Sequence, residues 1–570
     1  MSNNKKKDEN KDEKEDKKFS RRDLVKGLGA AYGLSLIKGR MVSQIVEGFV
    51  SSAQADTGLL PNFRYINFYT PGGIPRWYFD LPLIPNGNDQ FLLNKQVITS
   101  LSIGPDALLK GVYAHTKMGN KFYLPKIWSY PIPLSNGGVG TLNELANSAL
   151  FLRGVDQGID GHEFNTTRQN TPIPGGMTYT GLFADSGENP IPAARANSNF
   201  EHRSAKNKAS IDFNYRADLK VLSNSFNSFK TANPKSFGSL TLAQRTIEAA
   251  VKSIQKTQGA NSPYMTAIKE NRDNAIKLLN SSFDTIDADY SVIYTKYVSL
   301  ISASLRMVLP GVTDIPVNAI SRDPRFNILV SDFNPGVQSS ETTGDIRTGF
   351  QNIMVSPQFA HAFALAEYLI VKNLSSSVVA SLGFFSNFNI QNYYSFDGTT
   401  QTYKNLVSTP LFKTLGSDVH STGTFPALIM FTRHYHAYAT CLHELMTVLK
   451  SKNLYDKTLI QTTTEFNRIP RNDGSGSDHG FNGSATSLFT GRIKEPIVVG
   501  NILVNGSSRG TWGEGAPSSA LGQQKVNLGN VVSTICSIFE LPTPAPNNPS
   551  LVILDSAKIV TPVSKPLNIA

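Results

Sequence analysis

The sequence TLIQTTTEFNRIP, at residues 458–470, gives the strongest indication of the fold. Residues 458–464 are rich in β-branched side chains and predict a strand that ends at Glu465. The carboxyl end of a parallel strand delivers its side chains to the edge of the sheet at which ligands bind. Glu465 is therefore a candidate site residue.

Three more segments predict strands. FRYINFYT at residues 63–70 is largely apolar and runs into the glycine-rich loop Pro71-Gly72-Gly73. ALFLRGV at residues 149–155 leads into a polar segment, 156–170, which we expect to be a loop that carries His162. SVVASL at residues 377–382 is the third of these strands.

Helical patterns lie between and after these strands. Residues 359–370 precede the strand at 377–382, residues 426–449 precede the strand at 458–464, and this alternation favours an α/β fold. Helical spacing also occurs at residues 241–254, 264–279 and 290–308, so we expect 241–309 to be a helical insertion or cap. Residues 542–550 predict a loop, and 551–554 a final edge strand or tail.

The N-terminal segment has the order of features of an export signal. Residues 1–19 form a leader of mixed charge with little to bury, and we expect it to be disordered. In residues 20–55, the pair Arg21-Arg22 precedes two apolar residues, Lys26 and a weakly apolar stretch, and the sequence Ala-Gln-Ala ends at Ala55. This order resembles a twin-arginine signal.

The signal predicts the twin-arginine translocase as a partner and a periplasmic or extracellular location for the α/β domain at residues 56–570. The apolar stretch is too short and too polar for a permanent transmembrane anchor, and no later run reaches the roughly 20 apolar residues that a spanning helix needs.

Charge and cysteine content narrow the possible partners and cross-links. The formal net charge is +11, and residues 1–55 contribute +4 of it through 12 Lys and Arg against 8 Asp and Glu. No basic cluster interleaved with aromatic residues occurs, so we expect no nucleic-acid partner. Cys441 and Cys536 leave open one disulfide bond or two buried free thiols.

Two further segments concentrate side chains that bind metals. Asp418 and His420 are two residues apart, so in an extended segment both face the same side. Asp478 and His479 lie in a glycine- and serine-rich segment, where we expect a flexible loop to turn both toward one site. Oxygen and imidazole ligands without thiolate suit one divalent ion: zinc, manganese, magnesium or calcium. Histidines of the 426–449 helix, at 434, 436 and 443, are better explained as packing or surface residues.

These pieces occur in a recognisable order. A helix, a strand, Gly-x-Asp-x-His at 416–420, a long helix, a strand ending in Glu-Phe-x-Arg-x-Pro at 465–470, and Asp478-His479 follow one another. In this order the region 359–489 resembles the secreted proteins of domain-of-unknown-function family 1501, relatives of the alkaline phosphatase and sulfatase superfamily.

The resemblance implies a mixed, mostly parallel sheet with helices on both faces and a metal-dependent hydrolase of phosphate or sulfate esters. It implies five candidate metal ligands and, just after His162, two candidate nucleophiles: Asp418, His420, Glu465, Asp478 and His479, with Thr166 and Thr167. The chain departs from its relatives after the first strand, where no carboxylate precedes Asp80, so half of a two-metal site is missing. The alternative is a catalytically degenerate binding or envelope-associated protein with the same fold.

Overall fold

The computed structural model describes most of the region after residue 62. The described residues are 63–83, 116–118, 122–187, 189, 191–198, 200–206, 208–214, 218–219, 286–309, 357–383, 388–390, 394–397, 402–405, 413–415, 418–420, 424–470, 477–502, 514–518 and 521–563. The leader at 1–19, the signal region at 20–55 and two of the expected helices, at 241–254 and 264–279, lie outside them.

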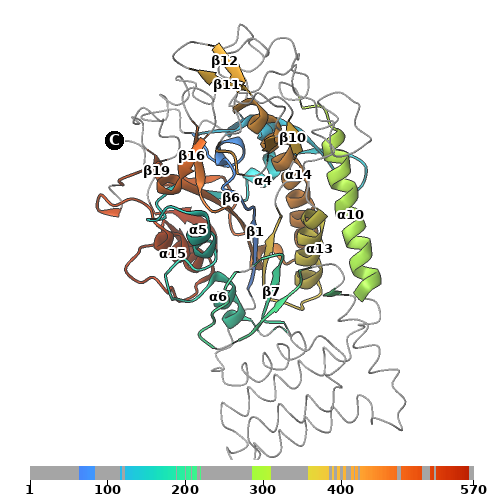
Figure 1. Ribbon diagram of the computed structural model, residues 1–570. Coiled ribbons are helices and arrows are strands. Elements are labelled where there is room, and N and C mark those ends of the chain that lie inside the picture. The colour runs from blue at the N-terminus through green and yellow to red at the C-terminus, as the bar shows by residue number, and fades with distance from the viewer. Residues whose placement is uncertain are drawn as a thin grey trace, which may run out of the picture.

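One eight-stranded sheet forms the centre of the molecule (Figure 1). Its strands are, in spatial order, β18 (Ile497–Val499), β6 (Ala149–Val155), β17 (Ser484–Phe489), β14 (Thr458–Thr463), β1 (Arg64–Tyr69), β9 (Ser377–Ser381), β7 (Ala193–Ala196) and β8 (Ser210–Asp212). Neighbouring strands are parallel except where β17 pairs with β14 and β6. The sheet is therefore mixed and mostly parallel, as the resemblance implies.

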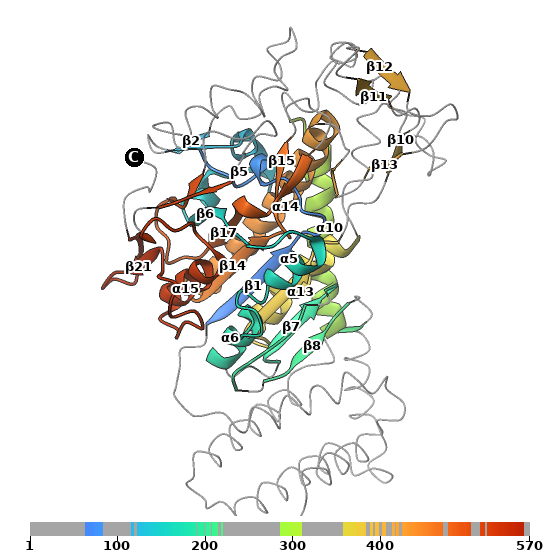
Figure 2. The same cartoon turned by 60° about the vertical axis from the view of Figure 1, so that its left-hand side comes forward.

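Three helices cover one face of the sheet: α10 (Ile286–Arg306), α13 (Pro357–Val371) and α14 (Thr424–Ser451) (Figures 1 and 2). Ile66 and Phe68 of β1 point to this face and join its apolar core. Phe68 stacks on Phe363 of α13, with ring centroids 4.1 Å apart. Alternate residues of β1 thus supply one face of the sheet.

The opposite face is covered by α6 (Tyr179–Ser186) and α15 (Leu528–Phe539) (Figure 2). Tyr65, the neighbour of Ile66, points this way and stacks on Phe183 of α6 with centroids 5.0 Å apart. The side chains of Asn527 and Asn530 form a capping box that starts α15. Helices therefore lie on both faces, which confirms an α/β architecture.

Helix α10 is the described part of the expected helical insertion. Its residues Tyr290, Tyr297 and Leu300 are buried in the same apolar core as α13 and α14. Lys296 extends from α10 between Glu367 of α13 and Glu444 of α14, with its Nζ 2.8 Å from the first carboxylate and 2.9 Å from the second. This part of 241–309 belongs to the helical layer of the main domain.

Outside the main sheet, the described residues also form two-stranded sheets and short helices. They are formed by β2 (Thr116–Met118) with β3 (Phe122–Leu124), β4 (Pro131–Pro133) with β5 (Val139–Thr141), β10 (Phe388–Ile390) with β13 (Lys413–Leu415), β11 (Tyr394–Asp397) with β12 (Thr402–Asn405), β15 (Asn467–Pro470) with β16 (Ser477–Gly480), β19 (Asn501–Ile502) with β20 (Gly515–Ala516), and β21 (Val552–Leu554) with β22 (Val560–Pro562), and by α4 (Asn143–Ala146) and α5 (His162–Arg168).

Two expectations need correction. The strand expected at residues 551–554 exists as β21, but it pairs with β22 rather than with the edge of the main sheet. The polar segment at 156–170 is not all loop, because α5 begins at His162.

Both cysteines are buried free thiols. Cys441 lies on α14 and Cys536 on α15, so the sheet separates them and the disulfide left open by the sequence does not form. His434 and His436 of α14 are buried, in agreement with a packing role. Among the described residues no helix has the length and apolar character to cross a membrane.

Candidate functional site

The ends of parallel strands bring the candidate residues to one edge of the sheet. The strand β6 is followed by α5, which begins with His162, and Glu465 lies two residues after the end of β14. Because these two strands run in the same direction, their carboxyl ends meet at the same edge. The β15–β16 hairpin adds His479, and the segment 418–420 adds His420.

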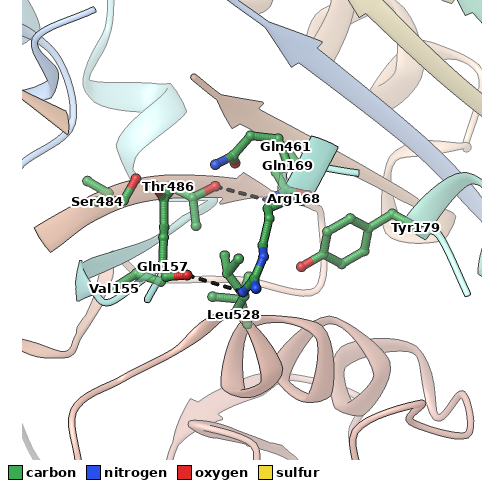
Figure 3. A pocket seen from close by; sticks show the side chains of 11 residues that line it. Val155, Gln157, Arg168, Gln169, Tyr179, Gln461, Ser484, Thr486 and Leu528 are labelled. Carbon is green, nitrogen blue, oxygen red and sulfur yellow. Dashed lines mark hydrogen bonds between the residues drawn. The ribbon is translucent and has the colours of Figure 1, made fainter. Parts of the chain in front are cut away.

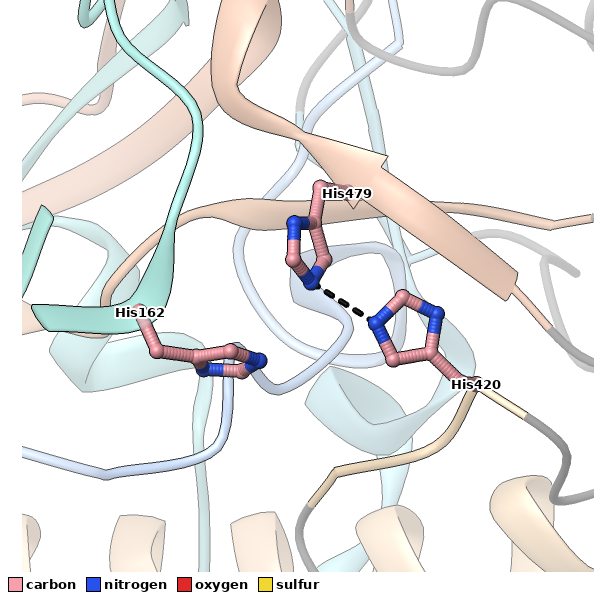
Figure 4. A group of neighbouring side chains, drawn as sticks. All are labelled: His162, His420 and His479. Carbon is pink, nitrogen blue, oxygen red and sulfur yellow. Dashed lines mark hydrogen bonds between the residues drawn. The ribbon is translucent and has the colours of Figure 1, made fainter.

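His162, His420 and His479, which we call the three-histidine group, each offer a ring nitrogen, and these atoms all lie within 4.8 Å of one another (Figure 4). Nε2 of His420 lies 2.7 Å from Nε2 of His479. The rings of His162 and His479 meet edge to face, with centroids 4.8 Å apart. Three imidazoles from distant parts of the sequence thus converge on one point.

Two carboxylates flank the three-histidine group. Oε2 of Glu465 lies 3.7 Å from Nδ1 of His162, and Oδ2 of Asp418 lies 3.6 Å from Nε2 of the same ring. Asp418 also approaches His420, with Oδ1 of Asp418 lying 3.8 Å from Nε2 of His420. The structure therefore brings together Asp418, His420, Glu465 and His479, with His162 in addition.

A layer of contacts behind the group holds its members. Oε1 of Glu465 accepts hydrogen bonds from the Tyr69 hydroxyl at 2.7 Å and from the backbone N–H of Gly72 at 2.8 Å. Nδ1 of His479 lies 2.5 Å from Oδ1 of Asp160. These contacts leave Oε2 of Glu465, which is buried and without a hydrogen-bond partner among the described residues, directed toward His162.

The loop after β1 contributes backbone atoms, and no carboxylate, to the surroundings of the three-histidine group. The loop donates from Gly72 to Glu465 and accepts from buried Arg468 at the carbonyls of Gly72 and Gly73. Asp80, the first carboxylate after β1, is instead buried in an ion pair with Arg76. Asp80 therefore forms a buried ion pair in the interior and does not belong to the carboxylates that flank the three-histidine group.

Phe466 packs beneath the histidines. Its ring centroid lies 4.0 Å from that of His479 and 4.9 Å from that of His162. Gly73 contacts the same ring and has φ +60°, and a Cβ on it would lie 2.3 Å from an atom of Phe466. The conformation of this loop and the placement of Phe466 therefore require glycine at position 73.

Charge and burial shift the pKa values in opposite directions. The pKa of His162 is raised, chiefly by the Glu465 carboxylate, whereas burial lowers the pKa values of His420 and His479. Burial acts to raise the pKa of Asp418, but neighbouring Arg468 outweighs it, with the two nearest histidines, and the pKa falls. Near neutral pH the group can therefore combine neutral imidazoles with an ionised carboxylate.

The other predicted residues take different positions. Asp478 and His479 are neighbours in β16 and not in a flexible loop, since β16 pairs with β15 in the register Ile469↔Asp478 and Arg468↔His479. Successive side chains of a strand point to opposite faces, so Asp478 lies on the face away from His479. This corrects the expectation that both turn toward one site.

The two candidate nucleophiles lie on α5. The hydroxyl of Thr166 donates to the backbone oxygen of His162 at 2.7 Å and lies 2.8 Å from the hydroxyl of Tyr69. Thr167 is exposed and donates to the backbone oxygen of Glu163 at 3.1 Å. Thr166 alone is therefore connected, through Tyr69, to Glu465.

Sequence reasoning did not include three members of this arrangement among the site residues: His162 as a ligand, Asp160 and Arg468. His162 lies in the polar segment that follows a predicted strand, which was a usable signal. Arg468 belongs to the Glu-Phe-x-Arg-x-Pro motif at 465–470, which was a second signal. Asp160 gave none, because its partner His479 is 319 residues away in the sequence.

A small cavity lies beside the site and separately from it (Figure 3). Its polar lining includes Gln157, Arg168, Gln169, Tyr179 and Gln461, and none of the three histidines lines it. Gln169 connects the two places, since its side-chain amide donates to the backbone oxygen of Glu465 at 3.0 Å. Gln169 therefore supports the backbone at Glu465, and the cavity is not part of the three-histidine group.

Comparison with known proteins gives a family match over part of the chain. No curated protein matches the chain. Residues 429–508 match the model of a family described as protein of unknown function, DUF1501. The match spans most of α14, β14, Glu465, the β15–β16 hairpin with His479, and β17, but neither Asp418 nor His162. Over residues 429–508, and therefore over one of the three segments that form the site, this chain is similar to family DUF1501.

Proposed function

We propose that the three-histidine group, with Asp418 and Glu465, holds one divalent metal ion, and that the protein is an exported metal-dependent hydrolase of phosphate or sulfate esters. The observation that carries the proposal is the convergence of three ring nitrogens within 4.8 Å of one another. Relationship to the alkaline phosphatase and sulfatase superfamily is part of the proposal and supplies the substrate class.

The residues present fit such an ion. Nδ1 of His479 faces the Asp160 carboxylate, so that nitrogen carries the proton and Nε2 carries a lone pair. This lone pair points at Nε2 of His420, 2.7 Å away. Nε2 of His162 and Oε2 of Glu465 are buried without hydrogen-bond partners among the described residues. A cation would take the lone pair of His479 and would satisfy the two buried atoms, His162 Nε2 and Glu465 Oε2, which otherwise remain unpaired at a cost.

The donor set narrows the choice of metal. Imidazole nitrogen suits zinc and the other late first-row metals, whereas magnesium and calcium prefer oxygen ligands throughout. Three imidazoles and two carboxylates without thiolate favour zinc among the four ions that the sequence leaves open.

The chain's own residues would then act as follows. A divalent ion polarises an ester oxygen and lowers the pKa of water. Glu465, fixed at Oε1 by Tyr69 and Gly72, would present Oε2 to the ion. Thr166 reaches this carboxylate through the hydroxyl of Tyr69, which makes it the better placed of the two candidate nucleophiles.

A second candidate function is a metal-binding protein without catalysis. The hydroxyl proton of Thr166 is donated to the backbone oxygen of its own helix, and so is that of Thr167. A threonine is a weak nucleophile until a base takes its proton. These contacts favour the binding role, unless water rather than a threonine hydroxyl serves as the nucleophile.

Metal content of the purified full chain tests the site. We expect one zinc ion per chain in the parent and in the control His443→Gln, which changes a histidine of α14 outside the group. We expect the double variant His420→Gln with His479→Gln to bind zinc at least about tenfold more weakly. Equal zinc binding by the double variant, or none by the parent, would overturn the metal site.

Activity then separates the two functions. The zinc-loaded parent should hydrolyse an aryl phosphate or an aryl sulfate, and His420→Gln should lose that activity. If zinc binds stoichiometrically and neither ester is cleaved, hydrolysis is excluded and the binding function is supported.

Export is proposed from residues 20–55 alone, through the twin-arginine translocase. Changing Arg21 and Arg22 together to lysine should retain the protein in the cytoplasm, while Arg40→Lys, which changes an arginine outside the pair, should not. Fractionation of cells that express each form decides this, and export of the double variant would contradict it.

A further inference from the structure

We propose that Asp160 is a positioning residue, which fixes the protonation and orientation of the His479 ring so that Nε2 faces the metal site. The inference rests on the proposed metal function for its purpose, but the contact itself is independent of any ion. Oδ1 of Asp160 lies 2.5 Å from Nδ1 of His479. Of all the contacts to the three-histidine group, this is the shortest that a carboxylate makes.

The backbone around Asp160 is shaped for this contact. Gly158 and Gly161 have φ values of +70° and +130°, which residues with a side chain rarely adopt. The backbone N–H of Gly158 donates to Asp156 at 2.8 Å and closes a turn. After these turns Asp160 contacts Nδ1 of His479, and His162, two residues later at the start of α5, contacts the ring of the same histidine.

Chemistry explains what the contact achieves. A neutral imidazole carries its proton on one nitrogen only, and a carboxylate at Nδ1 holds the proton there. In water the proton prefers Nε2, so a free His479 would present an N–H to the metal site instead of a lone pair. Histidines that bind metals commonly donate their other N–H to a carboxylate, and loss of that partner typically weakens metal binding by about 10- to 100-fold.

Exposure distinguishes the two partners. The side chain of Asp160 is 53% exposed, and that of His479 is 17% exposed. Asp160 therefore lies at the rim, where substitution need not disturb the core, whereas His479 packs on Phe466 with centroids 4.0 Å apart. Replacement of Asp160 should alter the ring of His479 without unfolding the β15–β16 hairpin.

The test uses full-length Asp160→Ala, with Glu163→Gln as the matched control. Glu163 is an exposed acid three residues further along the chain, so its replacement removes a negative charge from the same region but leaves the His479 contact. The first readout is nitrogen NMR of the metal-free protein labelled on histidine, with the His479 signals assigned by their loss in His479→Gln. The second is zinc affinity.

In the parent and in Glu163→Gln we expect His479 protonated on Nδ1. In Asp160→Ala we expect the signals to shift toward protonation on Nε2 and zinc to bind about 10- to 100-fold more weakly. Unchanged His479 signals in Asp160→Ala would overturn the inference whether or not zinc binds. If the parent itself binds no zinc, the proposed function fails, and the NMR result still decides whether Asp160 sets the state of the ring.

Discussion

Nη2 of Arg468 lies 2.7 Å from Oδ1 of Asp418, and the same guanidinium donates to the carbonyl oxygens of Gly72 and Gly73. Arg468 is fully buried, and burial lowers its pKa. One side chain thus ties the hairpin that carries His479 to the loop after β1 and to the segment that carries Asp418.

Arg468→Lys should lower the free energy of unfolding by about 2–4 kcal/mol, because an ammonium group cannot reproduce three hydrogen bonds in a planar fork. Urea unfolding measures the change. The control is Arg203→Lys, at an exposed ion pair with Glu201 in which the two side chains are 44% and 47% exposed. This substitution should cost less than about 1 kcal/mol, since exposed ion pairs contribute little. Equal losses in both variants would contradict the role of Arg468.

Gly73→Ala should destabilise the protein more than Gly137→Ala does. Both glycines have positive φ, at +60° and +83°, so both substitutions carry a backbone cost of about 1 kcal/mol. Only at Gly73 does the new Cβ also meet Phe466, whereas nothing lies within 4 Å of it at Gly137. We expect urea unfolding to show at least about 1 kcal/mol of additional loss at Gly73. Similar losses at the two positions would mean that Phe466 yields without cost.

The strands that position this site could be predicted from the sequence more fully than the contacts between its side chains. The ranges predicted for β1, β6, β9 and β14 agree with the structure to within two residues, because each is a short run of apolar or β-branched residues that can be buried on both faces of a sheet. The spacing of Asp418 and His420 was informative for a similar reason, since two residues apart is a local property of extended chain.

The remaining contacts depend on register and on chain pairs far apart in sequence. Gly and Ser residues before Asp478 suggested a loop, but pairing with β15 makes this segment a strand and sends Asp478 and His479 to opposite faces. The short strands β7, β8 and β18 gave no clear period, since three or four residues are too few to show one.

Lys296→Met should be far more damaging than Lys372→Met. Lys296 lies between two carboxylates, on Glu367 and Glu444, which are 6% and 10% exposed, so its loss leaves them close together without a cation. A broken buried pair costs about 3–5 kcal/mol. Lys372, the residue after α13, also pairs with Asp289 of α10, but this pair is 48% and 36% exposed and should contribute less than about 1 kcal/mol. Thermal or urea unfolding of both variants compares the two, and equal stabilities would contradict the assignment.

Acid should destabilise the protein partly through His436. This histidine is buried on α14, its Nε2 donates to the backbone oxygen of Pro131 at 2.7 Å, and burial lowers its pKa to about 4. The unfolded chain, with an ordinary histidine pKa of about 6.5, then binds more protons than the folded chain between those two values. Stability from this group is complete above about pH 6.5 and is lost as the pH falls toward 4.

His436→Gln keeps a side-chain N–H for Pro131 but removes the titrating ring. Between pH 7 and 5 the parent should lose about 2 kcal/mol more unfolding free energy than this variant does, from 1.4 kcal/mol for each pH unit below about 6.5. Urea unfolding at several pH values measures the slope for each protein, and any fixed cost of the substitution cancels because it is the same at every pH. Parallel curves for parent and variant would show that His436 takes up its proton equally in the folded and unfolded chains, and would contradict the neutral, buried state that its contact with Pro131 indicates.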